Sequence, residues 1–437
     1  MANKLYAGFG RECINPDFPV TLSGYGDNYK RPALGRENTI YITCVAIKND
    51  DDKTVMLYTM DGLSAGEEVA NELRTALKEA GCTVPVEQIY LCATHSHSCP
   101  AIDKRYTHGP EYCALVMERG VKAGLAALAD MSAATMKLAK DQVPKMAFVR
   151  HYIMKDGSYA GINYGDHTKG FQAHAEPVDE TLILLQLVRE DKPDILMVNF
   201  QAHAAMSADI GRFIVSPDWI GHMRNDLERD TGMLVAYYNG ASGNQITRSF
   251  LPEEKHGLKF HEYGSKMAQY ALELLPKLQS IEGAQIENRH HIFTCKTNNA
   301  WDHMLKEANE VFEVWHTVGD KEAEALARSY GFSSRYQTWQ IRAARNRPES
   351  ELREMNVFRV GPVGFTTGTY EMSSTEGIYV RTHSPFAATF ILCGNRKYIP
   401  TSKAYDMRTY EGDTAPYIRG TAEAMAEKYV EMLLTLQ

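Results

Sequence analysis

The sequence lacks several features that would place it in a membrane or in an oxidising compartment. Its first ten residues, MANKLYAGFG, hold no basic segment followed by an apolar run, so we expect no signal peptide. No uncharged apolar stretch approaches the roughly 20 residues of a membrane span, so we expect no stable membrane insertion. The eight cysteines form no CxxC pair and have no regular spacing. We therefore predict a cytoplasmic protein with reduced thiols.

The chain also lacks the positive charge that nucleic-acid binding requires. It has 47 basic and 55 acidic residues, a net charge of −8 and no basic stripe, so we expect no nucleic-acid partner. There is no internal repeat and no low-complexity tract. With 44% hydrophobic and 10% aromatic residues, the 437-residue chain can build a packed core of enzyme size. A homo-oligomer remains compatible with this composition.

Short β-like runs alternate with helical patterns. Runs rich in β-branched and aromatic residues predict strands at 40–47, 54–60, 88–93, 181–188 and 195–202. Apolar spacing predicts helices over Val69–Leu77, at 110–129, from SPDW (216–219) onward, and at 420–436. In SPDW, Ser216 is the expected N-cap and Pro217 the first-turn residue. This alternation predicts an α/β fold with mixed β-sheets flanked by helices.

Residues 301–354 differ from the rest of the chain. They are highly charged and helical in pattern, with no strand signal. We interpret them as a helical insertion that covers a site, with a solvated helical hairpin of no special role as the alternative. The whole chain, 1–437, is predicted to be a single catalytic-type domain around this insertion.

Two histidines follow a predicted strand in the stretch LCATHSHSCP (91–100). Residues i and i+2 of a strand face the same way, so His95 and His97 are expected to point together from a strand end. Such a pair can bind one metal ion, or one histidine can bind metal while the other acts as acid or base. A hydrogen-bonded pair of histidines is the plainer interpretation.

Further metal-type side chains follow other strands. His203 ends the run NFQAH, and Glu371 follows a short strand in GFTTGTYEMSS (364–374). Catalytic zinc often takes two histidines and one carboxylate, although a lone Glu371 also suits a helix start. Asp61 and Asp218 could accept a proton from the second nitrogen of a histidine and fix its tautomer. Their alternative roles are a turn residue and a helix-start residue.

Several motifs occur in an order that resembles one known family. They are AGFGRECINP (7–16), LSGYG (22–26), ATHSHSCP (93–100), NFQAH with VSPDW, NGASGNQ (239–245) and YIPTSKAYDMRTYEG (398–412). This order resembles the N-terminal catalytic domain of the neutral/alkaline, non-lysosomal ceramidases. The resemblance covers nearly the whole chain, with 301–354 least matched.

The resemblance implies a set of site residues. The family's zinc ligands fall on His95, His203, Glu371 and Tyr398, and its second strand histidine falls on His97. Its arginine falls on Arg150 and its second tyrosine on Tyr410. It thus implies Zn²⁺ as cofactor. With this metal in place, we predict that His97 is the general base. We predict that Arg150 and Tyr410 form hydrogen bonds to the oxyanion or to a carboxylate or carbonyl of the substrate.

The chain departs from the family at several places. Cys99 stands where the family has glycine, and we expect it to be a plain pocket residue, with crowding of the site or a soft metal ligand as alternatives. The active-site serine of the family's GDVSP-like segment falls on Ile246 in one register and on Ser242 in a shifted one. Because the chain is much shorter than the ceramidases, we also expect it to lack their C-terminal β-sandwich domain.

We therefore predict a zinc-dependent hydrolase that cleaves an amide-type bond with a metal-activated water. The expected substrate is a small soluble amide, lactam or ester, with a ceramidase-like lipid amidase as a variant. An amidohydrolase barrel is a rival, but that fold has HxH on its first strand, whereas here HxH follows at least three strand-like runs. A binding protein that kept this fold and lost the chemistry is the second rival.

Overall fold

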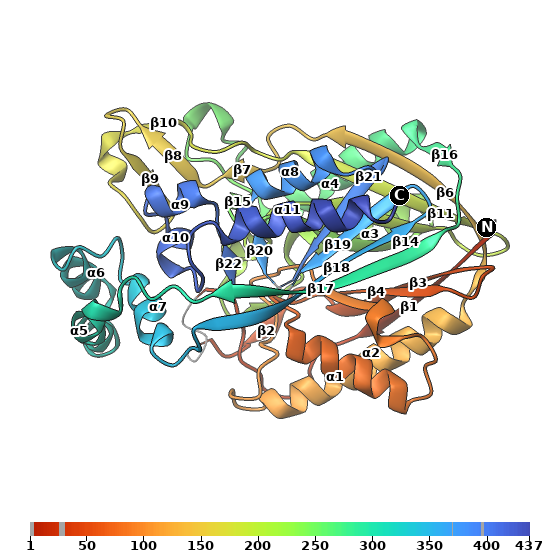
Figure 1. Cartoon of the computed structure of the whole chain (residues 1–437), viewed down its shortest axis with the longest axis horizontal. Helices are drawn as coiled ribbons and strands as arrows, with labels where there is room; N and C mark the ends of the chain where they lie inside the picture. Colours follow the sequence, from red (N-terminus) through yellow and green to blue (C-terminus); the bar gives the residue numbers. More distant parts are fainter. Residues whose placement is uncertain (1–3, 26–30, 369, 395–396) are drawn as a thin grey trace.

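Two open β-sheets form the centre of the molecule. A computed structural model describes residues 4–25, 31–368, 370–394 and 397–437 (Figure 1). The larger sheet runs in the order β14 (Leu234–Asn239), β12 (Ile195–Phe200), β11 (Thr181–Arg189), β6 (Ser132–Gln142), β1 (Leu5–Cys13), β3 (Tyr41–Asn49), β4 (Thr54–Met60) and β5 (Ile89–Ala93), with β16 (Gln279–Ile281) beside β6. Neighbouring strands are antiparallel, except that β12–β14 and β4–β5 are parallel.

The second sheet has four strands. Its order is β17 (Ile286–Lys296), β18 (Ser350–Val360), β19 (Val363–Gly368) and β21 (Ala388–Cys393). Only the β19–β21 pair is parallel. The predicted α/β class with mixed sheets is therefore confirmed. Open mixed sheets also exclude the amidohydrolase barrel, which is a closed ring of parallel strands.

The two sheets pack face to face through an apolar core. Tyr90 of β5 stacks on Phe358 of β18 with 4.4 Å between ring centroids, and Phe358 stacks on Phe365 of β19 at 4.6 Å. Offset and parallel aromatic contacts of this kind add to the free energy gained from burying the rings. This shared core fixes one sheet on the other.

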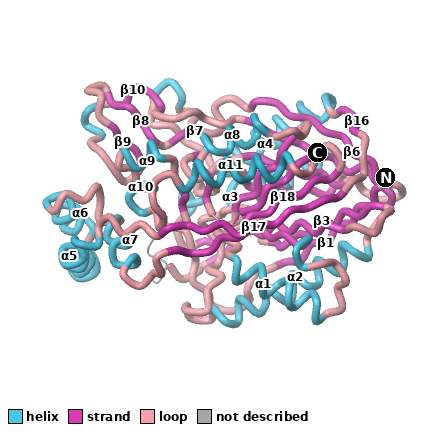
Figure 2. The backbone as a smooth tube through the Cα atoms, in the orientation of Figure 1, coloured by secondary structure: helices cyan, strands magenta, loops and turns pink. Residues whose placement is uncertain are grey.

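Helices cover the outer faces of both sheets, which makes four layers (Figure 2). Strand β4 shows why: all seven of its residues are buried, Val55 and Leu57 against the second sheet and Met56 and Tyr58 against helices. The covering helices of the large sheet are α1 (Glu67–Glu79), α2 (Gly109–Ala129), α3 (Asp218–Thr231) and α4 (Phe260–Leu274). Helices α8 (Ser374–His383) and α11 (Thr421–Leu434) cover the second sheet.

Helix α3 begins one residue later than predicted. Pro217 takes the N-cap position instead of the first turn, and Asp218 opens the helix with a left-handed φ of 59°. The Ser216 hydroxyl donates to Glu37 and accepts the Asp218 N–H at 3.0 Å. Ser216 thus bonds the first N–H of the helix from outside it, and the expectation that Ser216 is the N-cap residue was wrong.

Three helices lie between β17 and β18, at one end of the sheets (Figure 1). They are α5 (Leu305–Thr317), α6 (Asp320–Ser329) and α7 (Gln337–Ala344). They share a small core of their own, which includes Val311, Phe332 and Ile341. Strand β18 already begins at Ser350, so the helical part ends before residue 354. In the part of the chain that the structure describes, no helix is long and apolar enough to cross a membrane.

The close approach of α2 to β1 gives a stability prediction. A Cβ at Gly10 would overlap the carbonyl oxygen of Ala123 in α2, so Gly10→Ala must push the helix off the sheet. We expect a loss of about 2 kcal/mol in unfolding free energy, the usual cost of overpacking, measured by urea denaturation. The control is Gly35→Ala in β2 (Gly35–Arg36), where a Cβ meets only the mobile end of Ile214. Equal stability of the two variants would contradict this close packing.

Candidate metal centre

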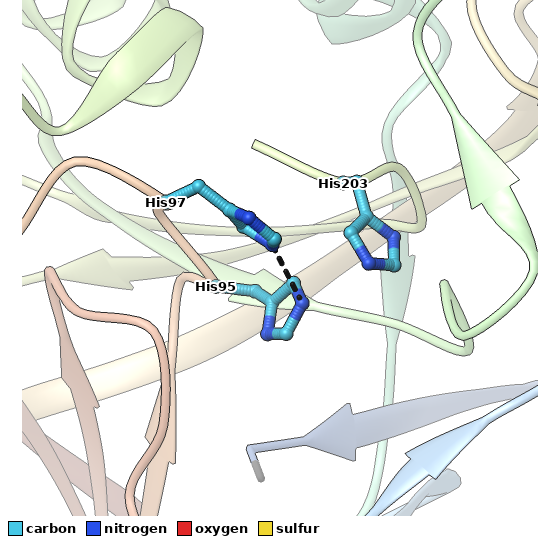
Figure 3. A group of neighbouring side chains, drawn as sticks. All are labelled: His95, His97 and His203. Atoms are coloured by element: carbon cyan, nitrogen blue, oxygen red, sulfur yellow. Dashed lines mark hydrogen bonds between the residues drawn. The ribbon is translucent and has the colours of Figure 1, made fainter. Parts of the chain in front are cut away.

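Three histidines meet where two strands end. His95 and His97 follow β5, and His203 follows β12 (Figure 3). The Nε2 atoms of His95 and His97 are 3.3 Å apart, and one ring nitrogen from each of the three histidines lies within 4.8 Å of the others. His95 and His203 are buried, whereas His97 is half-buried. The structure thus brings together all three strand-end histidines.

The backbone reaches this arrangement differently from the predicted strand alternation. Strand β5 stops at Ala93, and His95 has a left-handed φ of 65°. A parallel bridge then pairs Ser96 with Ala204, and the His97 N–H donates to the Ala204 carbonyl at 2.9 Å. The two histidine segments are therefore joined directly by their main chains. Positive φ in a non-glycine residue is uncommon and is found at strained functional sites.

Backbone carbonyls fix the orientation of two imidazoles. Nδ1 of His95 lies 2.8 Å from the Leu63 carbonyl, and Nδ1 of His203 lies 2.8 Å from the Ser242 carbonyl. A carbonyl can only accept, so both Nδ1 atoms carry a proton, and the Nε2 atoms of both rings are left to face the centre.

The aspartates considered for this orienting role are engaged elsewhere. Asp61 pairs with Arg224 at 2.9 Å and accepts the Tyr41 N–H, while Asp218 accepts the N–H groups of Ser207 and Trp219. Asp61 therefore acts as a turn residue and Asp218 as a helix-start residue. The prediction that they fix the tautomer of a histidine was wrong. The carbonyls of a folded chain supply the acceptors instead.

Glu371 completes the buried cluster. It opens β20 (Glu371–Met372), which pairs in parallel with β22 (Tyr398–Ile399) so that Glu371 lies opposite Tyr398. Its Oε2 atom is 3.3 Å from His95 Nε2 and 3.4 Å from His203 Nε2. Glu371 Oε2 and His203 Nε2 are both buried and, among the described residues, neither has a hydrogen-bond partner.

The protonation states of these groups suit a cation. Burial, Arg150 and His95 lower the pKa of His203 to about 4, and burial with the neighbouring imidazoles lowers the pKa of His97 well below its usual value. Burial acts to raise the pKa of Glu371, but the facing imidazoles outweigh it and hold this pKa at about 2. Among the described residues, the buried atoms His203 Nε2 and Glu371 Oε2 have no hydrogen-bond partner, and burying two such lone pairs together is costly unless a cation lies between them. The residues present fit a divalent metal ion.

Beside this cluster lies a cavity of about 420 Å³. It is lined by His97 and His203 and by three further residues of the predicted site, Arg150, Tyr398 and Tyr410. The ring of Tyr410, which opens α10 (Tyr410–Thr414), lies 5.8 Å from the ring of Tyr398. All seven residues of the predicted site thus lie in or beside one cavity.

Arg150 has charged and polar partners of its own. It follows β7 (Phe148–Val149), and its guanidinium donates to Glu411 and, at 2.9 Å, to the Gly243 carbonyl. Its Cζ atom lies 5.5 Å from the Tyr398 ring centroid. The ion pair with Glu411 holds this cation at the cavity wall.

A second buried ionic network was not predicted from the sequence. His151 lies between two carboxylates, with Nδ1 on Glu176 and Nε2 at 2.7 Å from Glu411. Glu411 in turn pairs with Arg150, so the network ends at the cavity. His151 and Glu411 are the chain neighbours of Arg150 and Tyr410, and no spacing pattern links residues so distant in the sequence.

The positions at which the chain departs from the resembled family lie as follows. Cys99 is fully buried in the core under α1 and α2, with its thiol toward the Ser216 carbonyl. It lines neither the cavity nor the histidine cluster, so the expectation of a pocket residue was wrong. Ile246 lines the cavity, whereas the Ser242 hydroxyl is buried and accepts from Asn239 at 2.8 Å.

The comparisons with known proteins give a likeness at the level of fold. No protein-family model and no curated protein sequence matches the chain. Among solved structures, the neutral ceramidase from Pseudomonas aeruginosa superposes with a TM-score of 0.73 at 14% identity, over 99% of this chain and 74% of that one. A ceramidase complexed with C2 gives the same score and identity, over 99% and 75%. The chain therefore has a ceramidase-like fold, which confirms the fold that the sequence motifs implied.

The buried network makes a pH prediction. Burial acts to lower the pKa of His151, but Glu411 and Glu176 outweigh it and raise this pKa to about 9. A pKa above the unfolded value of about 6.5 means that the charged histidine stabilises the fold fully below pH 6.5, and that this gain disappears as the pH rises through 9. The contribution is of the order of 3 kcal/mol.

The test is the unfolding free energy of the wild type and of His151→Gln between pH 6 and pH 10. We expect the difference between the two proteins to shrink steadily above pH 6.5, because glutamine does not titrate. A difference that stays constant over this range would show that His151 is not held charged by its carboxylates.

Proposed function

We propose that the protein is a zinc-dependent hydrolase of amide-type carbon–nitrogen bonds. The observation that carries this proposal is a pair of buried atoms, Glu371 Oε2 and His203 Nε2, which lie beside His95 Nε2 and have no hydrogen-bond partner in the described part of the chain. Two histidines and one carboxylate are a common ligand set of catalytic zinc. His95, His203 and Glu371 would hold the ion, with Tyr398 as a fourth ligand from the paired strand β22.

The chain's own residues would then carry the proton and orient the substrate. Bound zinc supplies an acidified water and a polarised substrate carbonyl. His97 is half-buried on the cavity side, and its Nδ1 atom has no hydrogen-bond partner among the described residues. It would take a proton from the attacking water and pass it to the leaving amine. Tyr410 and Arg150, on the cavity wall, would donate hydrogen bonds to the carbonyl oxygen as it gains charge.

The proposed substrate is a small soluble amide, or a related ester or lactam, in place of ceramide. Part of the cavity wall is polar or charged, with Arg150, Asn163 and Thr247 among its residues, which suits a polar small molecule. All eight cysteines are free thiols, which supports the cytoplasm as the proposed compartment. The rival, a protein that binds a ligand in the same cavity without hydrolysing it, predicts metal binding without turnover.

A second assignment of His97 deserves a test because of its position. Its Nε2 atom is as close to His95 as Glu371 is, and the three imidazoles alone could hold an ion. His97 would then be a metal ligand, and the general base would have to be another group. Metal content separates the two assignments directly.

The experiment measures zinc content and hydrolysis of a panel of amides and esters for three alanine variants. We expect His95→Ala to lose both zinc and activity, and His97→Ala to keep zinc while its turnover falls roughly 100- to 10,000-fold, the usual weight of a general base. His290→Ala, an exposed histidine on β17, is the control and should keep both. Loss of zinc in the His97 variant would favour the three-histidine assignment. Full zinc content and full activity in the His95 variant would overturn the proposed site.

A further inference from the structure

The cavity beside the metal centre is lined by basic side chains although the protein is acidic. Three arginines line it, Arg150, Arg212 and Arg248, and no aspartate or glutamate occurs among its described lining residues. The chain as a whole carries a net charge of −8. A cleft of one sign raises the local concentration of ligands of the opposite sign. This charge distribution points to an anionic group on the molecule that enters the cavity.

The three arginines differ in the partners they already have. Arg150 is ion-paired with Glu411, and Arg248 makes two contacts to Asp209 at 2.8 and 2.7 Å. The guanidinium of Arg212 has no carboxylate within salt-bridge distance in the described part of the chain, and its side chain is exposed. Among the described residues, Arg212 is therefore the lining arginine whose guanidinium no carboxylate already neutralises, and it can bind an incoming anion.

One aromatic ring links Arg212 to the metal centre. The Arg212 Cζ atom lies 5.2 Å from the ring centroid of Tyr25, and that ring lies 5.4 Å from the ring of His97. The Tyr25 hydroxyl donates to the Ala205 carbonyl at 3.0 Å, which holds the ring in place. Tyr336 and Trp339 add further aromatic wall to the same cavity.

We propose that Arg212 binds a carboxylate of the substrate, so that the enzyme acts on amides that carry a carboxylate about one aromatic ring away from the scissile bond. The part of this inference that concerns the scissile amide rests on the proposed hydrolase function. The binding of the carboxylate by Arg212 does not depend on it. Arginine suits this role because its planar guanidinium matches a carboxylate with two parallel hydrogen bonds. The aromatic walls suit a flat spacer between the carboxylate and the amide.

The size of the effect follows from exposure. A charge-assisted hydrogen bond is strong in a dry site, but Arg212 is exposed and water weakens the interaction. We expect about a ten-fold preference for a carboxylate over a neutral isostere, near the lower limit for such bonds. The preference should weaken as salt is added, since the pair is screened.

The probes are 4-acetamidobenzoate and the neutral 4-acetamidobenzamide, which have the same ring and the same acetamide. Their dissociation constants are measured by calorimetry on zinc-loaded and on chelator-treated protein, for the wild type, Arg212→Gln and Arg289→Gln. Arg289 is an exposed arginine on β17 and is the matched control. Far-UV circular dichroism checks that the variants are folded.

We expect the wild type and Arg289→Gln to prefer the carboxylate about ten-fold, with and without zinc, and Arg212→Gln to lose the preference. A preference that survives in Arg212→Gln, or one that exists only with zinc present, would overturn the proposal, since the carboxylate would then bind elsewhere or to the ion. Failure of both probes to bind would overturn it as well.

Turnover of the two probes separates this inference from the proposed function. An Arg212-dependent preference in binding, with neither probe hydrolysed, would uphold the anion site and count against the hydrolase. Equal binding and equal hydrolysis of both probes would support the hydrolase and overturn the anion site.

Discussion

The candidate centre depends on one short main-chain contact between two distant segments. The bridge between Ser96 and Ala204, with the hydrogen bond from His97 to the Ala204 carbonyl, ties the end of β5 to the end of β12. Without it, His95 and His203 would belong to two independent loops. Imidazoles must be placed to within fractions of an ångström to share an ion. A backbone contact therefore positions them more accurately than a contact between mobile side chains would. Glu371 and Tyr398 are positioned by the same device, the pairing of β20 with β22.

Many strands and helices could be predicted because buried segments have a characteristic pattern of apolar residues. The run TVMLYTM is apolar throughout since β4 is covered on one face by the second sheet and on the other by helices. The packing of the two sheets could not be predicted in this way. A residue such as Phe358 shows in the sequence that it is buried, but not that its partners are Tyr90 and Phe365. The displaced start of α3 depends on a hydroxyl that Glu37, far away in the chain, also binds.

The candidate site divides along similar lines. The positions of His95, His97 and His203 after predicted strands indicated that they belong to the site. The order of the motifs indicated the same for Arg150, Tyr398 and Tyr410. The left-handed turn at His95 was not foreseen, because a strand pattern gives no sign of where a strand stops. The acceptors for the imidazole N–H groups are backbone carbonyls, which every residue has, so no residue type could identify them. His151 and Glu176 were missed because their importance arises only where distant segments meet.

The floor and the side wall of the cavity come from different parts of the molecule. The histidines follow two strands of the larger sheet, whereas Tyr336 and Trp339 belong to the helical segment between β17 and β18, which has its own small core. Tyr336 meets Tyr410 edge to face at 5.5 Å, so the two parts touch where a ligand would lie. Exchanging those helices for a different set would reshape what the cavity admits and leave the strand ends as they are. Related chains could in this way carry out the same reaction on different substrates, because only the helical segment between β17 and β18 would have to change.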